Sequence, residues 1–145
     1  MKDANLIKET LDSLEFEVLY HENLIDRDAI YKSIKDFTKK LDSTDVSMIY
    51  YAGHGIQVDG RNYLVPTKVE LTDEGDVEHY CYSLDNLMKS LSEYENKVNV
   101  IVLDACRDNP FESKWRGKSY GAKGLVGIES PDGCIIAYST KTGKV

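Results

Sequence analysis

The stretches VSMIYYA at residues 46–52 and VNVIVL at residues 98–103 are almost continuous apolar runs. Runs of this length that are rich in Val and Ile are typical of strands covered on both faces, as in a parallel sheet. Gly53 and Gly55 follow the first run and predict its end. We therefore expect both stretches to be central strands of one sheet.

Three amphipathic helices are predicted around these strands. Apolar residues recur at helical spacing in the segment from Asp3 to Leu14, while Asp26 and Ser83 are suited to cap the second and third helices. The predicted inner faces are Ala4, Ile7, Leu11 and Leu14; Ile30, Ile34, Phe37 and Leu41; and Leu84, Leu87, Met88 and Leu91.

Shorter patterns complete the expected fold. They predict strands at residues 16–20 and 134–138, a hairpin over residues 56–66 that turns at Asp59-Gly60, and loops over residues 73–78 and 107–132. Strands that alternate with helices indicate an α/β fold with a parallel sheet and helices on both faces. Because crossovers in such sheets are right-handed, the strands at 46–52 and 98–103 should run in the same direction.

Length and composition restrict the class of protein. The chain has 145 residues, which suits one domain, and 41% are hydrophobic against 30% charged. The net charge of −7 argues against nucleic acid as the main partner, since phosphate binding needs a basic surface. Neither a membrane-length apolar run nor a signal-peptide pattern is present, which favours a cytoplasmic protein that binds no membrane.

The three cysteines, Cys81, Cys106 and Cys134, form no CxxC pair. So sparse and odd a set indicates neither a disulfide framework nor a zinc site, and it fits a reducing compartment. We expect Cys81 and Cys134 to lie in the core.

One histidine and one cysteine are predicted to meet. His54 follows the strand at 46–52 and Cys106 follows the strand at 98–103, and ligands of open α/β sheets bind at the carboxyl ends of the strands. An imidazole is the usual activator of a thiol, which is mostly protonated at neutral pH. The sequence therefore predicts a Cys–His pair at this edge of the sheet.

The segments MIYYAGHG, NYLVP, VIVLDACRDNP and GCIIAYSTKTG resemble the caspase-like cysteine peptidases over nearly the whole chain. The His-to-Cys separation of 52 residues is similar to the spacing of about 50 in caspases. The Asp104-Ala105-Cys106-Arg107-Asp108 stretch most resembles paracaspases and their bacterial relatives, while caspases proper carry QAC and metacaspases DSC. The resemblance implies a caspase-like three-layer sandwich with a mostly parallel central sheet.

The resemblance also implies a mechanism. Cys106 would be the nucleophile and His54 the general base and then acid of a dyad, with the backbone N–H groups of Gly55 and Cys106 forming the oxyanion hole. Asp104 lies two residues before Cys106 and so on the same side of the strand, and the matching aspartate of the family lines the S1 pocket and selects Arg or Lys. The expected reaction is peptide hydrolysis after Arg or Lys through an acyl-thioester.

The same resemblance sets expectations for partners and extent. Protein or peptide substrates with a basic P1 residue are expected, with no cofactor, no metal, and a homodimer or partner domains outside this chain as further options. The resemblance leads us to expect that residues 1–145 form one peptidase domain without the family's first strand and its C-terminal strand and helices.

Alternatives remain open at this point. Cys106 could be a small apolar residue at a strand end, His54 a turn histidine, and Asp104 a cap of loop amides. The whole chain could be a non-catalytic interaction module with the same fold. The acidic run from Asp73 to Glu78 could bind calcium, although it lacks the EF-hand spacing and acidic loops are usually solvated.

Overall fold

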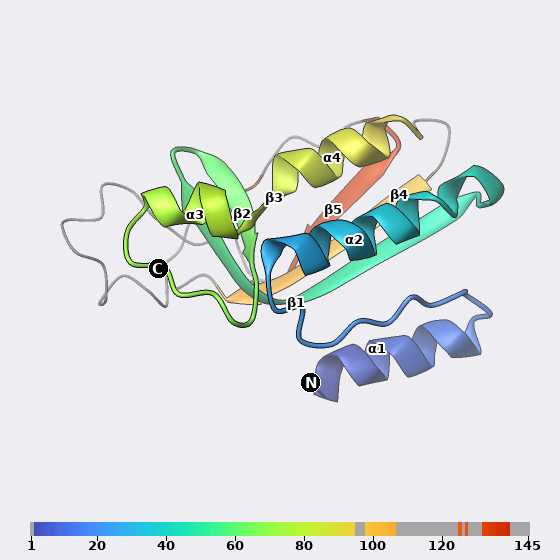
Figure 1. The fold of residues 1–145 in the computed structure, drawn as a ribbon. Helices are drawn as coiled ribbons and strands as arrows, with labels where there is room; N and C mark the ends of the chain where they lie inside the picture. The colour runs from blue at the N-terminus through green and yellow to red at the C-terminus, as the bar shows by residue number, and fades with distance from the viewer. Residues whose placement is uncertain (1, 95–97, 107–124, 126, 128–131, 140–145) are drawn as a thin grey trace.

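A mixed sheet forms the centre of the protein. The computed structural model describes residues 2–94, 98–106, 125, 127 and 132–139, and within them the strand order is β3-β2-β1-β4-β5 (Figure 1). The strands are β1 (Val46–Val58), β2 (Arg61–Val65), β3 (Tyr82–Ser83), β4 (Val98–Cys106) and β5 (Cys134–Tyr138). As predicted, β1, β4 and β5 are parallel, whereas β2 and β3 are added antiparallel at one side.

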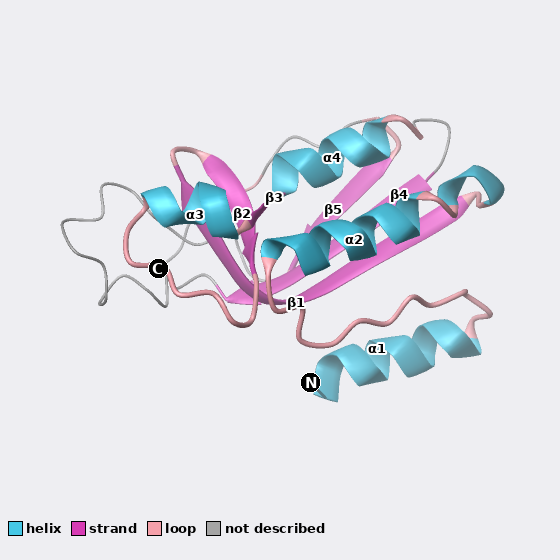
Figure 2. Cartoon of the chain, viewed as in Figure 1, coloured by secondary structure: helices cyan, strands magenta, loops and turns pink. Residues whose placement is uncertain are grey.

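Helices cover the sheet unequally. They are α1 (Lys2–Ser13), α2 (Arg27–Thr38), the 3-10 helix η1 (Leu41–Ser43), α3 (Gly75–Tyr80) and α4 (Leu84–Ser92). Figure 2 shows α2 and α4 lying next to each other over the sheet, while α1 lies on the other side of β1. The predicted α/β fold, with helices on both sides of the sheet, is confirmed.

Two of the helices begin where their capping residues predict. The side chain of Asp26 accepts a 2.7 Å hydrogen bond from the Ala29 backbone N–H, and that of Ser83 accepts one of 3.2 Å from Asp85. Each bond satisfies a backbone donor that has no partner within the helix. Leu41 belongs to η1 rather than to α2, but it is buried as expected.

The main core lies between the sheet and the two helices α2 and α4. Its sheet side comes from Ile101 and Leu103 of β4, and its helix side from the apolar faces predicted for α2 and α4. A second, smaller cluster packs β1 and β2 against α3 and contains Ile56, Val77 and Cys81. The opposite face of the sheet is less covered, so the prediction of strands covered on both faces is wrong in part: Val46 and Val98 are 48% and 45% exposed.

Strand β1 does not end at its glycines. It continues through Gly53 and Gly55 to Val58, because β2 pairs with it from His54 onward. The predicted turn is confirmed: Asp59 and Gly60 have φ angles of 49° and 78°, as in a type I′ hairpin.

The segment at residues 16–20 is not a strand. A strand needs a hydrogen-bonded neighbour, and within the described chain no strand pairs with this segment. On the β1 edge away from β4, β2 pairs from His54 onward, and no other described strand lies beside the earlier part of β1.

The acidic segment is partly helical, which corrects the loop prediction for residues 73–78. Asp73 accepts a hydrogen bond from the Asp76 N–H at the start of α3, and Asp76 in turn accepts from the backbone and hydroxyl of Thr72. These local bonds use the acidic side chains as caps, which stabilises a short helix in a segment with little apolar content.

Near the end of the chain, the described strands lie close to their predicted bounds. β5 has the predicted bounds, and β4 runs three residues beyond the predicted end, to Cys106. Most of the predicted loop at 107–132 lies outside the described residues. Among the described helices, none has the length and apolar character needed to cross a membrane.

Candidate active site

His54 and Cys106 are direct partners on neighbouring strands. In the parallel pairing of β1 with β4, the register runs from Val46 opposite Val98 to His54 opposite Cys106. Neighbouring strands lie about 4.8 Å apart, and paired positions share a face of the sheet. The side chain of Cys106 lies outside the described part, and the imidazole of His54 is exposed. The backbone register thus brings together the two positions that the sequence predicted to meet.

Both positions lie within strands rather than beyond them, which corrects the sequence reading in detail. His54 has a strand partner on each side: Cys106 of β4 and Val65 of β2. A residue paired on both sides is held more firmly than a loop residue at a strand end.

Asp104 lies on the same face, two positions before Cys106. Its register partner is Ala52, and its carboxylate is half-buried. The Tyr50 hydroxyl donates a 2.9 Å hydrogen bond to Oδ2 of Asp104. Among the described residues no cation forms an ion pair with this carboxylate. In the part of the chain that the structure describes, the hydrogen bond of this side chain therefore comes from a neutral donor.

The two glycines beside His54 are closely packed. A Cβ added to Gly53 would lie 2.7 Å from the Tyr51 hydroxyl oxygen, and one added to Gly55 would lie 2.5 Å from Cγ of Leu125. The space on the Cβ sides of both glycines is thus taken by side chains of the protein.

The remaining histidines and cysteines lie apart from this site. His21 is exposed, and His79 belongs to α3, where its ring meets Tyr80 edge to face. Burial raises the pKa of the Cys81 thiol to about 12, and burial also raises the pKa of Cys134. Both thiols are therefore protonated at neutral pH and poorly suited to nucleophilic attack.

Metal ligation finds no support in the part of the chain that the structure describes. No group of three or more His, Cys, Asp or Glu side chains is placed there to hold an ion. Asp73 and Asp76, from the run considered for calcium, are engaged in backbone hydrogen bonds around α3.

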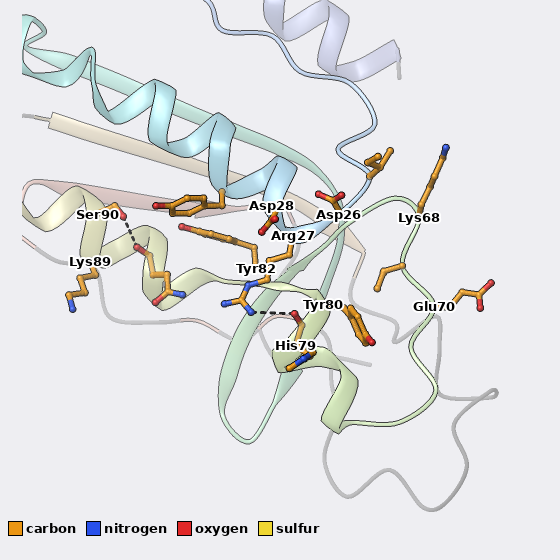
Figure 3. Close-up of a pocket in the computed structure, with 14 residues that line it drawn as sticks. Asp26, Arg27, Asp28, Lys68, Glu70, His79, Tyr80, Tyr82, Lys89 and Ser90 are labelled. Atoms are coloured by element: carbon orange, nitrogen blue, oxygen red, sulfur yellow. Dashed lines mark hydrogen bonds between the residues drawn. The ribbon is translucent and has the colours of Figure 1, made fainter.

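A separate cavity of about 950 Å3 lies near the start of α2, the end of α3 and the outer side of α4 (Figure 3). Neither His54 nor Asp104 lines it. Arg27 crosses its wall and donates to the backbone oxygens of Glu78 and His79. The arginine holds the end of α3, and the cavity does not open onto the Cys–His pair.

Tyr50 and Tyr51 are the site residues that the sequence reading missed. They lie four and three positions before His54, and strand alternation places them on opposite faces of β1. The signal was present in the YYAGHG segment, but the partner of each hydroxyl depends on the strand register.

Comparison with known proteins agrees with the fold. A sequence model of the caspase domain, the peptidase C14 family, matches residues 1–145. This chain belongs to that family, whose members are cysteine peptidases in general, and it shares their α/β architecture. It is 30% identical over 105 residues to the human mucosa-associated lymphoid tissue lymphoma translocation protein 1 and to its mouse homolog. The match covers 72% of this chain and 12% of each relative.

Proposed function

We propose that this protein is a cysteine endopeptidase that hydrolyses peptide bonds after Arg or Lys. The observation that carries the proposal is the register that makes His54 and Cys106 neighbours on parallel strands, in a chain of the caspase domain family. The other two cysteines have raised pKa values, which leaves Cys106 as the candidate nucleophile.

The proposed reaction has two halves. His54 takes the proton of the Cys106 thiol, and the thiolate sulfur bonds to the scissile carbonyl carbon. The oxyanion that forms accepts hydrogen bonds from the backbone N–H groups of Gly55 and Cys106. His54 then gives its proton to the leaving amine, the C–N bond breaks, and an acyl-thioester remains. Water, deprotonated by His54, attacks the thioester and releases the acid and the thiol.

Asp104 is the proposed selector of the P1 side chain. Its carboxylate lies on the same face as the dyad positions, is half-buried, and has one oxygen engaged by the Tyr50 hydroxyl. A guanidinium can bind such a carboxylate through two N–H groups, whereas an ammonium binds it as a point charge. We therefore expect Arg to be preferred over Lys.

Peptide cleavage and active-site labelling test the dyad. Cys106→Ala and His54→Ala should each lower kcat/KM for an Arg-P1 peptide at least about a thousandfold, with the double variant little worse than either single one. An arginyl fluoromethyl ketone should label the wild type at Cys106. Cys134→Ala and His21→Ala are matched controls and should keep activity.

Two outcomes would contradict the proposal. Full activity in Cys106→Ala or His54→Ala would remove the dyad. A folded wild type that neither cleaves the peptide nor reacts with the ketone would favour the alternative, a non-catalytic interaction module of the same fold.

The setting of the enzyme belongs to the same proposal. Cys81 and Cys134 are free thiols, which suits a reducing compartment, and we propose a cytoplasmic peptidase acting on peptide or protein substrates. A second copy or partner domains outside this chain are the proposed assembly partners. Cell fractionation and light scattering test the location and the assembly; a membrane-bound or secreted product would contradict the first.

A further inference from the structure

The Tyr51 hydroxyl lies directly behind the candidate site. Its single O–H is shared between two backbone oxygens, that of His54 at 2.8 Å and that of Val65 at 3.1 Å. His54 and Val65 are partners across the β1–β2 pair, so one hydroxyl joins the two strands at the histidine. Burial holds the pKa of this phenol above its ordinary value, so it stays protonated and keeps its donor.

Gly53 allows the Tyr51 hydroxyl to reach the backbone oxygens of His54 and Val65. The Tyr51 ring lies against the Gly53 backbone, where an added Cβ would be 2.7 Å from the hydroxyl oxygen and 2.8 Å from Cζ. Any other residue at position 53 would have to move the ring, because Cβ atoms do not approach other heavy atoms so closely. Tyr51 and Gly53 therefore hold the His54 carbonyl together: the tyrosine donates the hydrogen bond, and the glycine leaves space for its ring.

The peptide unit that Tyr51 holds joins His54 to Gly55, two residues of the proposed mechanism. The carbonyl of His54 and the N–H of Gly55 belong to the same planar trans peptide and point in opposite directions. Because the carbonyl shares its donor with Val65, it is directed toward β2. The Gly55 N–H is then directed the other way, toward β4, the strand that carries Cys106.

We propose that Tyr51 is a positioning residue that orients the His54–Gly55 peptide and thereby aims the Gly55 N–H into the oxyanion hole. This inference rests on the proposed peptidase function. The backbone of His54 is held on three sides, by β2, by β4 and by the Tyr51 hydroxyl. An oxyanion donor acts only when it is aimed at the position of the developing charge.

Kinetics of Tyr51→Phe give the first test. Removing one oxyanion donor costs roughly a hundredfold to a thousandfold in kcat, so a misaimed donor should cost about tenfold to a hundredfold, with KM within about twofold. Alkylation of Cys106 by iodoacetamide needs no oxyanion hole and should change less than about threefold. Tyr82→Phe removes a hydroxyl from the same core cluster without touching His54 and is the matched control.

A second variant, Gly53→Ala, perturbs the same peptide by displacing the Tyr51 ring. It keeps the hydroxyl, and it should lower kcat to a similar degree. Because both changes break one interaction, the double variant should be little worse than the worse single variant. Unchanged kcat in Tyr51→Phe, or an equal loss of hydrolysis and alkylation, would overturn the inference.

A spectroscopic arm separates this inference from the proposed function. In Tyr51→Phe the carbonyl carbon resonances of His54 and Val65 and the amide resonance of Gly55 should shift, whereas Tyr82→Phe should leave them in place. Unmoved resonances would overturn the positioning role whether or not the wild type cleaves peptides. If the resonances shift in Tyr51→Phe but the wild type has no activity, the contact of Tyr51 with the His54–Gly55 peptide is supported and the peptidase proposal is contradicted.

Discussion

The two faces of the central sheet differ in what covers them. On β4, Ile101 and Leu103 face α2 and α4 and are 0% and 1% exposed. The alternate residues Val102 and Asp104 lie on the other face and are only half-buried. Neighbouring residues of one strand therefore lie in different environments, because side chains alternate across the pleat.

This difference separates the residues that hold the fold from those that carry the candidate chemistry. The face beneath α2 and α4 is apolar and closely packed, whereas the opposite face carries His54 and Asp104 and leaves Ile135 57% exposed. A carboxyl group is costly to bury without a partner, so the less covered face suits Asp104 better than the apolar face does. Substitutions on the two faces should consequently affect different measurements.

The largest expected effect is on stability. Leu103→Ala should lower the free energy of unfolding by about 2–5 kcal/mol, because it removes buried methyl groups and leaves a cavity beneath the helices. Val102→Ala is the control, because Val102 precedes Leu103 in β4 and lies on the other face. It should lower the free energy of unfolding by less than about 1.5 kcal/mol. Urea denaturation measures both. Equal losses would show that the two faces contribute alike and would break the comparison.

A smaller effect is expected on specificity. Asp104→Asn should lower kcat/KM for an Arg-P1 peptide about thirtyfold, since the guanidinium would lose its charged partner on desolvation. Reaction of the thiol with a small neutral alkylating agent should be unchanged. Asp45→Asn, an exposed aspartate just before β1, serves as the control. Normal cleavage by Asp104→Asn, or a wild type that prefers Asp at P1, would make the aspartate structural.

The smallest expected effect concerns the donor to that carboxylate. Tyr50→Phe removes the 2.9 Å bond to Asp104 and should raise KM for the Arg-P1 peptide about fivefold, at nearly constant kcat. The same change in the Asp104→Asn background should add little to the loss in KM, because the Tyr50–Asp104 hydrogen bond is already altered there. Additive losses in the double variant would argue that Tyr50 acts on something other than Asp104.

The sequence predicted those parts of the fold that depend on local signals. Asp26 and Ser83 cap helices as expected, the Asp59-Gly60 turn forms, and β5 has its expected bounds. The meeting of His54 with Cys106 was also predictable, because parallel strands bring their carboxyl ends together.

The predictions were wrong where the structure of a segment depends on pairing with another, distant segment of the chain. Residues 16–20 have strand composition but no partner strand in the described chain, and β1 passes its glycines because β2 supplies hydrogen bonds beyond them. The roles of Tyr50 and Tyr51 depend on which atoms the register places within reach of each hydroxyl. Strand composition carries no information about such contacts between segments.

The change of partner along β1 also has a kinetic consequence. The β1–β2 pairing is a hairpin, which closes within microseconds, whereas the pairing of His54 with Cys106 joins residues 52 positions apart. The long loop must close before β4 can dock, so the hairpin should precede the parallel pairing in folding. Cys106 would then reach its place beside His54 late in folding. A chain still being synthesised could form the hairpin that carries His54 before β4 is available, so His54 and Cys106 would meet only once β4 has docked on β1.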